Sequence, residues 1–492
     1  MKIRTMLQGF EWNLPADSMH WSRMEEKCAE LKDLGFTDVW LPPAYKGFNG
    51  VHDVGYGVYD LYDLGEFDQK GTVCTKYGSK DQYLALIDAL HAQGMKVIAD
   101  IVLNHKMGGD ATQKMKVTKL DTNSRSRVIK EHKLIEAWTM FTFPGRKGVY
   151  SDFIWTKDHI TAVDYDARTG ISNVFLLEEK VFSDHVSKEL DNYDFLMGID
   201  LDLNHPEVRE ELIKWGKWYM DFTGIDGFRL DAVKHMDYDF YPEWLAKMRQ
   251  HKGGEMFAVG EYWRDTDFAL YEIDGYLKDC RKCMSLFDVP LHRNFYKACE
   301  KGAAYDLRTI FDGTLVQYEP WYAVTFVDNH DTQPGQALES WISSWFKPLA
   351  YALILLREGG FPCVFYGDLY GTQAFGKDVK NDVTGEVESF PIQPVAPCTS
   401  LKKLLQIREH YAHGEQKDYF EKYNCIGWSR GDSFAVVMST NGNDSIRMKL
   451  GRPGQMFIDL LGNDTKPVFI EEDGTAEFRT RGNSVSVWVP KE

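Results

Sequence analysis

Gly227-Phe-Arg-Leu-Asp-Ala-Val-Lys-His235 is a short apolar run that ends abruptly in charged and titratable side chains. The same form recurs in Ile98-Ala-Asp-Ile-Val-Leu-Asn-His105, in Val259-Gly-Glu-Tyr-Trp263 and in Phe326-Val-Asp-Asn-His-Asp331. Burying Asp, Glu, His and Arg at strand ends is costly unless these groups are paired or used. Repeated strands with polar ends are typical of a parallel αβ barrel, in which the strand ends form one functional face.

The rest of the chain supports this fold class, because strand-like runs alternate with helix-like stretches. Amphipathic helices are indicated at 22–34, 80–93 and 207–222, and Gly35 and Gly94 follow two of them where a helix C′ residue is expected. We therefore predict a (β/α)₈ TIM barrel. Its strands are expected at 4–12, 38–43, 97–103, 226–231, 257–262, 285–290, 323–329 and 362–367.

Two segments interrupt the alternation. The connection between Asn104 and the helix near 207 is too long for a plain loop, so we expect a β-rich inserted domain at 104–206, after the third strand. Beyond about residue 395, a helix near 399–411 precedes short alternating runs at 424–429, 433–439 and 484–489. These runs predict a C-terminal antiparallel β-sandwich domain at 397–492. The barrel then comprises 1–103 and 207–396.

Composition excludes some classes of function. The net charge of −17 and the pI near 5.3 argue against a nucleic-acid partner, which requires a basic face. The sequence contains no run of 18 or more apolar residues, so no membrane span is expected. The N-terminus lacks an apolar stretch of signal-peptide length, so a cytoplasmic protein is expected if Met1 is the native start. A protein whose leader had been removed would look the same.

The eight cysteines include one C-x-x-C pair, Cys280 and Cys283. This pair has neither a second pair nor a His at zinc spacing. We expect it to be reduced and incidental, without a metal or redox role, and we expect no structural disulfides.

The polar strand ends now support a resemblance. Residues 100–105, 227–235, Glu261 and 326–331 resemble, in order, the four signature regions of the α-amylase family of glycoside hydrolases. A fifth region, Leu196-Met-Gly-Ile-Asp-Leu-Asp-Leu-Asn-His205, lies at the end of the insertion, as in that family. The resemblance covers nearly the whole chain. Residues 54–67 and the Lys234-His235 pair are similar to the bacterial liquefying type and its leaderless intracellular relatives.

The resemblance implies endo-hydrolysis of α-1,4-glucosidic bonds in starch, glycogen or maltodextrins by a retaining mechanism. It makes Asp231 the nucleophile, Glu261 the acid and base, and Asp331 a third carboxylate that binds and distorts the sugar. Retaining hydrolysis requires two carboxyl groups roughly 5–5.5 Å apart. The family pattern also implies substrate contacts from Tyr56, His105, Arg229, Lys234, His235, Trp263 and His330.

The residues themselves fit these roles. Arg229 precedes Asp231 by two positions, so both side chains lie on one side of the strand and Arg229 is expected to lower the pKa of Asp231. An ordinary salt bridge is the alternative. Tyr262 and Trp263 follow Glu261 and could raise its pKa for the acid role, whereas a solvated Glu is the alternative.

A structural calcium ion is also implied by the resemblance. Its ligands would be Asn104, Asp194, Asp200 and the backbone carbonyl of His235, all hard oxygen ligands that Ca²⁺ prefers. Alternatively, Asp194 and Asp200 only cap turns. One Ca²⁺ is expected.

The chain departs from the extracellular liquefying enzymes at further carboxylate positions of the insertion. Those enzymes hold a calcium–sodium–calcium cluster, whereas here two of the positions are Thr161 and Ser183 and a third is Asn204. Asp202 remains, and Asp164 or Asp184 could partly compensate. We predict no cluster.

Other functions fit the sequence less well. A maltooligosaccharide-forming hydrolase or a transglycosylase differs mainly in acceptor-side loops, which the sequence resolves poorly. A non-catalytic glucan-binding protein is disfavoured because Asp231, Glu261 and Asp331 are all present. A zinc hydrolase is disfavoured because no strand-end His-x-His occurs among the 14 His. The expected partner is an α-glucan or maltooligosaccharide, and the expected state is a monomer.

Overall fold

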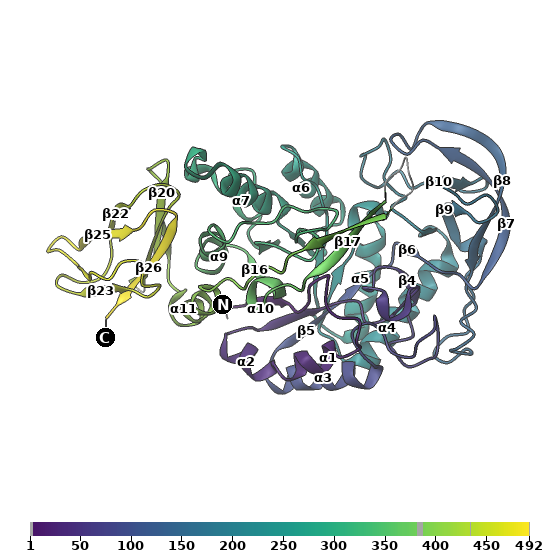
Figure 1. Cartoon of the computed structure of the whole chain (residues 1–492), viewed down its shortest axis with the longest axis horizontal. Coiled ribbons are helices and arrows are strands. Elements are labelled where there is room, and N and C mark those ends of the chain that lie inside the picture. The colour runs from purple at the N-terminus through teal and green to yellow at the C-terminus, as the bar shows by residue number, and fades with distance from the viewer. Residues whose placement is uncertain (1–2, 381–386, 433, 492) are drawn as a thin grey trace.

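A closed barrel of eight parallel strands forms the centre of the computed structural model, which describes residues 3–380, 387–432 and 434–491. The barrel order is β1-β16-β15-β14-β13-β12-β5-β2 (Figure 1). Each of the eight predicted runs overlaps one of these strands, so the predicted barrel is confirmed. The strands are β1 (Met6–Gln8), β2 (Asp38–Leu41), β5 (Lys96–Ile101), β12 (Gly227–Leu230), β13 (Phe257–Gly260), β14 (Ser285–Phe287), β15 (Ala323–Phe326) and β16 (Phe361–Phe365).

Helices connect the barrel strands and pack around them. The helix predicted at 22–34 is divided into α1 and α2, because the chain turns at Glu26 and Lys27, where the Lys27 N–H donates to the Met24 carbonyl. α3 begins with a capping box between Ser79 and Gln82. The helices are α1 (His20–Glu25), α2 (Cys28–Asp33), α3 (Lys80–Ala92), α4 (Pro206–Thr223), α5 (Phe240–Lys252), α6 (Ala269–Asp279), α7 (Val289–Lys301), α8 (Leu315–Tyr318), α9 (Lys347–Leu355), α10 (Tyr366–Tyr370) and α11 (Leu401–Tyr411).

The segment after β5 forms a separate antiparallel sheet at one end of the molecule (Figure 1). β6 begins this sheet and β11 returns to pair with it, which places Asp200 opposite His105. The return strand therefore brings the end of the insertion back to the barrel. In sheet order the strands are β6 (His105–Lys106), β11 (Ile199–Leu201), β9 (Ile160–Asp166), β10 (Ile171–Leu177), β7 (Ala111–Leu120) and β8 (Val128–Met140).

The C-terminal region lies at the opposite end of the molecule and consists of antiparallel strands (Figure 1). A six-stranded sheet and the β22–β25 pair enclose an apolar core that includes Phe457, Phe478 and Trp488. The three predicted runs correspond to β20, β21 and β26. Ser433, at the start of the second run, lies outside the described residues, as does Met1. The strands are β19 (Gln416–Tyr419), β20 (Cys425–Arg430), β21 (Phe434–Ser439), β22 (Asp444–Lys449), β23 (Met456–Asp459), β24 (Val468–Phe469), β25 (Thr475–Thr480) and β26 (Ser484–Pro490).

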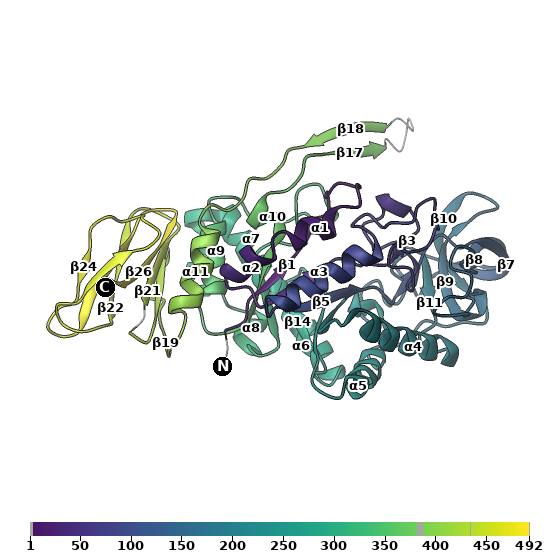
Figure 2. The same cartoon turned by 90° about the horizontal axis from the view of Figure 1, so that it is seen from below.

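Two short pairings were not predicted. β3 (Lys46–Gly47) pairs with β4 (Val58–Asp60) beside the barrel. β17 (Phe375–Lys380) and β18 (Val387–Ile392) form a hairpin that projects from the barrel beyond α10 (Figure 2). Their sequence, rich in charged residues, lacks the apolar pattern of a barrel strand. Within the described residues, no helix is long and apolar enough to cross a membrane.

Gly227 provides a test of how closely the barrel strands pack. A Cβ atom at this position would lie 2.4 Å from the carbonyl oxygen of Phe257 and 2.9 Å from the Ile98 side chain. We expect Gly227→Ala to lower the free energy of unfolding by about 1–3 kcal/mol, because β12 would be pushed away from β13. Gly254→Ala is the control, since no atom lies within 4 Å of its added Cβ. Calorimetric melting temperatures that fall equally in both variants would contradict this expectation.

Candidate active site

One buried guanidinium organises the carboxyl ends of three neighbouring barrel strands. Arg229 lies on β12 and donates from Nη1 to Asp231 (2.7 Å) and to Asp100 (2.9 Å). From Nη2 it donates to Glu261, at the end of β13 (2.5 Å). Only 1% of the Arg229 surface is exposed, so these bonds form away from bulk water. Asp231 and Glu261 thus bind the same guanidinium, which holds their carboxyl groups close together.

Backbone pairing places these groups at one level of the barrel. The Asp231 N–H donates to the Ile101 carbonyl (3.1 Å), and the Glu261 N–H donates to the Leu230 carbonyl (2.9 Å). Each bond continues the parallel ladder one residue past the end of β12 or β13. The carboxylates therefore come from adjacent strands at the same height, as the sequence predicts for a barrel face.

Burial and mutual charge set the titration of these carboxyl groups. Burial raises the pKa of Asp231, and Arg229 opposes this rise. The expected effect of Arg229 is therefore present, but desolvation outweighs it. Burial also raises the pKa of Glu261, and the neighbouring Asp231 charge adds to the rise. The Arg229 guanidinium opposes this rise, as it does for Asp231.

Asp331 and His330 follow β15 and complete the carboxyl cluster. Burial and the charge of Glu261 raise the pKa of Asp331 well above its usual range. The Gln8 amide donates to Nδ1 of His330 (3.0 Å), so Nε2 carries the proton and faces Asp331 (3.3 Å). Burial and Arg229 lower the pKa of His330, which is consistent with a neutral ring.

Aromatic rings form a wall beside these groups. The Tyr56 ring stacks on His330 at a centroid distance of 5.2 Å, and Trp12 stacks on Tyr56 at 5.8 Å. The Tyr56 hydroxyl donates to Asp100 (2.9 Å), which fixes the ring relative to the Arg229 cluster. The structure thus brings Tyr56, His330, Asp331, Asp231 and Glu261 together.

The other predicted substrate contacts flank this cluster. His105 forms a hydrogen bond from Nε2 to the Tyr56 carbonyl (2.9 Å). Lys234 donates to Glu189 (2.8 Å) and to the Trp263 carbonyl (2.8 Å). His235 bonds through Nδ1 to the Tyr193 carbonyl, and burial lowers its pKa to about 3. Their side-chain hydrogen bonds therefore go to the protein frame around the carboxyl cluster.

A groove of about 470 Å³ crosses the start of the insertion. Its lining includes Phe48, Trp138 and Tyr165, which are 45%, 47% and 41% exposed. Asp164 also lines the groove and interacts electrostatically with His105. Exposed aromatic rings in a concave surface suit flat apolar faces of a ligand.

The predicted calcium ligands lie where the insertion meets the barrel. Asp200 lies opposite His105 in the β11–β6 pairing. His105 directly follows Asn104 in the chain, so Asp200 lies near Asn104. Burial raises the pKa of Asp194 to about 7, and the Asp194 charge adds to the raised pKa of Asp200. In the described part of the chain, neither carboxyl group forms an ion pair with Lys or Arg. Two buried carboxyl groups without a cationic side chain fit a bound divalent cation.

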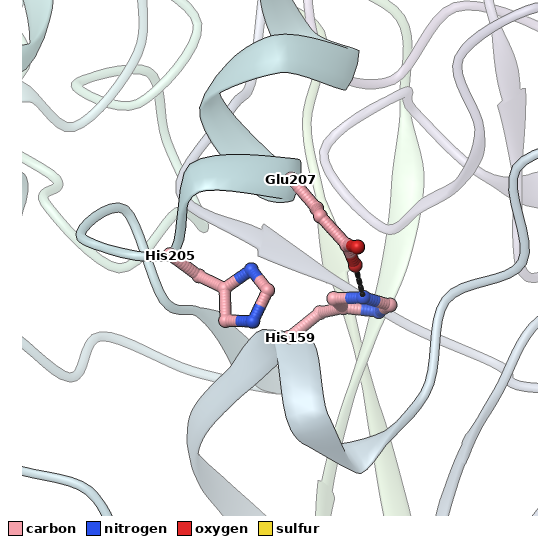
Figure 3. Close-up of side chains that lie close together, drawn as sticks. All are labelled: His159, His205 and Glu207. Atoms are coloured by element: carbon pink, nitrogen blue, oxygen red, sulfur yellow. Dashed lines mark hydrogen bonds and ion pairs between the residues drawn. The ribbon is translucent and has the colours of Figure 1, made fainter.

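Figure 3 shows a second group with metal-ligating atoms, His159, His205 and Glu207, at the start of α4. The Thr156 N–H donates to Nδ1 of His159 (3.1 Å), so Nε2 carries the proton and donates to Glu207 (3.1 Å). A metal ion at Nε2 would displace this proton and leave Nδ1 protonated against a second donor. The contact instead links the insertion to α4.

Comparison with known proteins decides the family. Residues 20–390 match the family profile described as alpha amylase, catalytic domain. The chain belongs to the α-amylase family. It is a glycoside hydrolase, as its matches over nearly the full length also show. The family resemblance of the four strand-end motifs is thereby confirmed.

Similar α-amylases cover the whole chain. An alpha-amylase of Geobacillus stearothermophilus is 45% identical over 99% of this chain and 87% of that protein. The cytoplasmic alpha-amylase of Escherichia coli K12 is 43% identical over 100% of both chains. A glucan 1,4-alpha-maltohexaosidase of Bacillus sp. strain 707 is 45% identical over 99% of this chain and 92% of that protein.

Solved α-amylase structures share the fold. The alpha-amylase of Geobacillus thermoleovorans, complexed with acarbose, has a TM-score of 0.63 at 18% identity. That match covers 100% of this chain and 98% of that chain.

Sequence reasoning missed several residues of this α-amylase site. Asp100 lies within a quoted motif, yet only the β5–β12 register shows that it contacts Arg229. Gln8 and Trp12 come from the first strand and its loop, and reach His330 and Tyr56 only through barrel closure. Glu189 meets Lys234 across 45 residues of chain. Gln8, Trp12 and Glu189 can be recognised only from their contacts in the folded structure. Asp100 could have been found from the sequence, because a buried Asp on a barrel strand requires a cationic partner.

Arg229→Lys tests the organising role of the guanidinium. A lysine ammonium is a compact charge and cannot reproduce the planar fork that Arg229 presents to its carboxyl partners. We expect kcat to fall about 100-fold through misplacement of the carboxyl groups. Arg357→Lys is the control, because Arg357 makes a two-point contact with Asp418 outside the cluster. Steady-state rates on a soluble maltooligosaccharide measure the effect, and equal rates in both variants would exclude this role.

Proposed function

We propose that this α-amylase cleaves internal α-1,4-glucosidic bonds of starch, glycogen or maltodextrins with retention of configuration. The observation that carries the proposal is the sharing of Arg229 by Asp231 and Glu261 at adjacent strand ends. A retaining mechanism requires a nucleophilic carboxylate and a proton donor beside one glycosidic bond. The paired geometry supports both roles.

The roles of the two groups follow from their surroundings. Asp231 accepts from Arg229, which favours its ionised form, and we assign it as the carboxylate that attacks the anomeric carbon. Glu261, whose pKa is raised by burial, donates its proton to the leaving oxygen. The resulting glycosyl ester is hydrolysed when Glu261 removes a proton from water that attacks the same carbon. Glu261 then regains its acid form, and Asp231 is released.

The remaining site residues position the sugar. Tyr56 offers a ring face beside the carboxyl cluster, and Asp331 and His330 offer an acceptor and a donor for sugar hydroxyls. We assign His105 to the same sugar. We assign Lys234, His235 and Trp263 to the leaving-group side, where Lys234 and the Trp263 carbonyl are joined. Further glucose units would stack along the groove lined by Phe48, Trp138 and Tyr165.

Product length separates two candidate activities. The relatives include enzymes named alpha-amylase and a glucan 1,4-alpha-maltohexaosidase at equal identity, 45%. We favour endo-action with mixed products, and a single dominant oligosaccharide would instead favour the second activity. A transglycosylase would yield chains longer than the substrate.

We further propose one structural Ca²⁺, held by Asn104, Asp194, Asp200 and the backbone carbonyl of His235. These groups provide only oxygen ligands, as Ca²⁺ requires. The ion would neutralise Asp194 and Asp200 and hold the insertion beside the cleft. A larger cluster is not favoured, because Lys180 pairs with Asp202 (2.7 Å) and the Thr161 hydroxyl donates to Asp200. The Ser183 hydroxyl likewise donates to Asp237 (2.7 Å).

The cell compartment and assembly state are also inferred. The 43% identical E. coli relative is named cytoplasmic and matches over its full length, which supports a cytoplasmic enzyme. The acidic net charge of −17 supports a neutral glucan as partner and disfavours nucleic acid. We propose a monomer that acts on α-glucan or maltooligosaccharide without a membrane partner.

Asp231→Asn tests the nucleophile. We expect kcat to fall by roughly 10⁴–10⁶-fold in a protein that still folds, because the covalent step is lost while the side-chain volume is kept. The control is Asp221→Asn, which removes an exposed carboxylate that contacts His251.

Digestion of a reducing-end-labelled maltooligosaccharide, with detection of the anomer first released, measures both rate and mechanism. Near-normal turnover in Asp231→Asn, or inversion at the anomeric carbon in the wild type, would overturn the assignment.

Chelation tests the metal. We expect EDTA to lower the melting temperature and Ca²⁺ to restore it, since a site filled at 100 times its Kd adds about 2.7 kcal/mol. Metal analysis of the dialysed protein should find one tightly held ion per chain. Asp194→Asn should abolish the EDTA response, whereas melting that is indifferent to EDTA in the wild type would argue against the site.

A further inference from the structure

The loop between α6 and β14 contains the C-x-x-C pair, which hydrolysis does not use. Cys280 follows the last residue of α6, and one residue, Met284, lies between Cys283 and β14. Cys280 is fully buried, whereas Cys283 is partly exposed. Sequence analysis predicts an incidental pair, but the conformation of this loop points to a chemical role.

Backbone hydrogen bonds hold the two cysteines in one tight turn. The Cys283 N–H donates to the Cys280 carbonyl (3.1 Å), and the Lys282 N–H donates back to Leu277 (2.8 Å). A β-turn of this kind keeps its first and fourth Cα atoms within about 7 Å. A disulfide requires about 4.4–6.8 Å between Cα atoms, a range that a turn of this size permits.

The two residues inside the turn adopt an unusual conformation. Arg281 has φ +57° and Lys282 has φ +51°, both in the left-handed region. Turns with two such residues favour Gly, Asn and Asp, because side chains with a Cβ are strained there. The helix end and the turn together impose this conformation on Arg281 and Lys282. The cysteine spacing is therefore fixed by the fold.

The two sulfur atoms differ in their chemistry. The Cys280 Sγ–H donates to the Leu277 carbonyl (3.5 Å), and the neighbouring Cys280 thiol together with the Arg249 guanidinium lowers the pKa of Cys283. Arg249 is held there by donation to the Cys283 carbonyl (2.8 Å). Burial instead raises the pKa of Cys28, Cys299, Cys363, Cys398 and Cys425. A partly exposed cysteine with a lowered pKa beside a second thiol is the arrangement that reacts with disulfides.

We propose that Cys283 and Cys280 form a reversible thiol-modification site that reacts with small-molecule disulfides. The Cys283 thiolate attacks one sulfur of the disulfide RSSR, which forms a mixed disulfide and expels one thiolate RS⁻. Cys280 then loses its proton to RS⁻ or solvent, attacks the Cys283 sulfur and expels the second RS⁻. Overall, the dithiol and RSSR become a Cys280–Cys283 disulfide and two RSH. A small dithiol reverses the reaction.

The site lies away from the catalytic groups. The loop precedes β14, and so lies at the amino end of a barrel strand, whereas Asp231 and Glu261 follow the carboxyl ends of theirs. Modification is therefore expected to leave kcat unchanged. The proposal is independent of the proposed hydrolytic function, and either can fail without the other.

Competitive thiol mapping of the full-length protein tests the proposal. The reduced protein is exposed to oxidised glutathione, remaining thiols are alkylated, and each cysteine is quantified by peptide mass spectrometry. We expect Cys283 to react at least 10-fold faster than Cys74 and Cys398, which are also partly exposed. The end product should be a Cys280–Cys283 bridge, two mass units lighter than the dithiol, and dithiothreitol should reverse it.

Variants separate the two steps. In Cys280→Ser the glutathione adduct should persist on Cys283, and in Cys283→Ser this loop should not react. Cys74→Ser is the matched control and should behave as the wild type. Reaction of Cys283 no faster than Cys74 in the wild type would overturn the proposal. So would an adduct on Cys283 that never resolves to the bridge while Cys280 is present.

Discussion

The burial of one positive charge among several negative ones is the constraint on which the site depends. Arg229 is out of contact with bulk water, so its desolvation must be offset by Asp100, Asp231 and Glu261. Those partners come from three adjacent strands, and only a correctly registered barrel brings them to one guanidinium. Removing any partner leaves buried charge uncompensated. The desolvation of Arg229 is offset only when the barrel strands are in the correct register, and the same register positions the carboxyl groups.

The insertion is held to the same frame by a short return path. β11 pairs with β6, so the chain leaves the barrel and comes back beside its point of departure. Lys106, in β6, is buried and donates to the Tyr59 carbonyl (2.6 Å), while His105 bonds to the Tyr56 carbonyl. Tyr56, which stacks on His330, is thus held at its carbonyl by His105 and at its hydroxyl by Asp100. A shift of the insertion would therefore also move Tyr56.

Much of this arrangement is visible in the sequence, and the rest depends on long-range contacts. The eight barrel strands and the carboxylates Asp231, Glu261 and Asp331 follow from apolar runs that end in charge. Asp100 and Gln8 acquire their roles only when strands distant in sequence become neighbours. The β17–β18 hairpin was not predicted because charged residues interrupt the apolar ones in its sequence, which leaves no continuous apolar run. The net rise in the pKa of Asp231 was also missed, since desolvation cannot be read from the adjacent Arg229.

The elongated arrangement of the molecule has a practical consequence. The insertion and the C-terminal sheets lie at opposite ends of the barrel, and the chain terminates in the sheet that is remote from the insertion (Figure 1). Attaching the enzyme to a solid support through its C-terminal sheets would direct the groove lined by Phe48, Trp138 and Tyr165 away from the carrier. Long polysaccharides could then approach an immobilised catalyst without steric obstruction by the matrix.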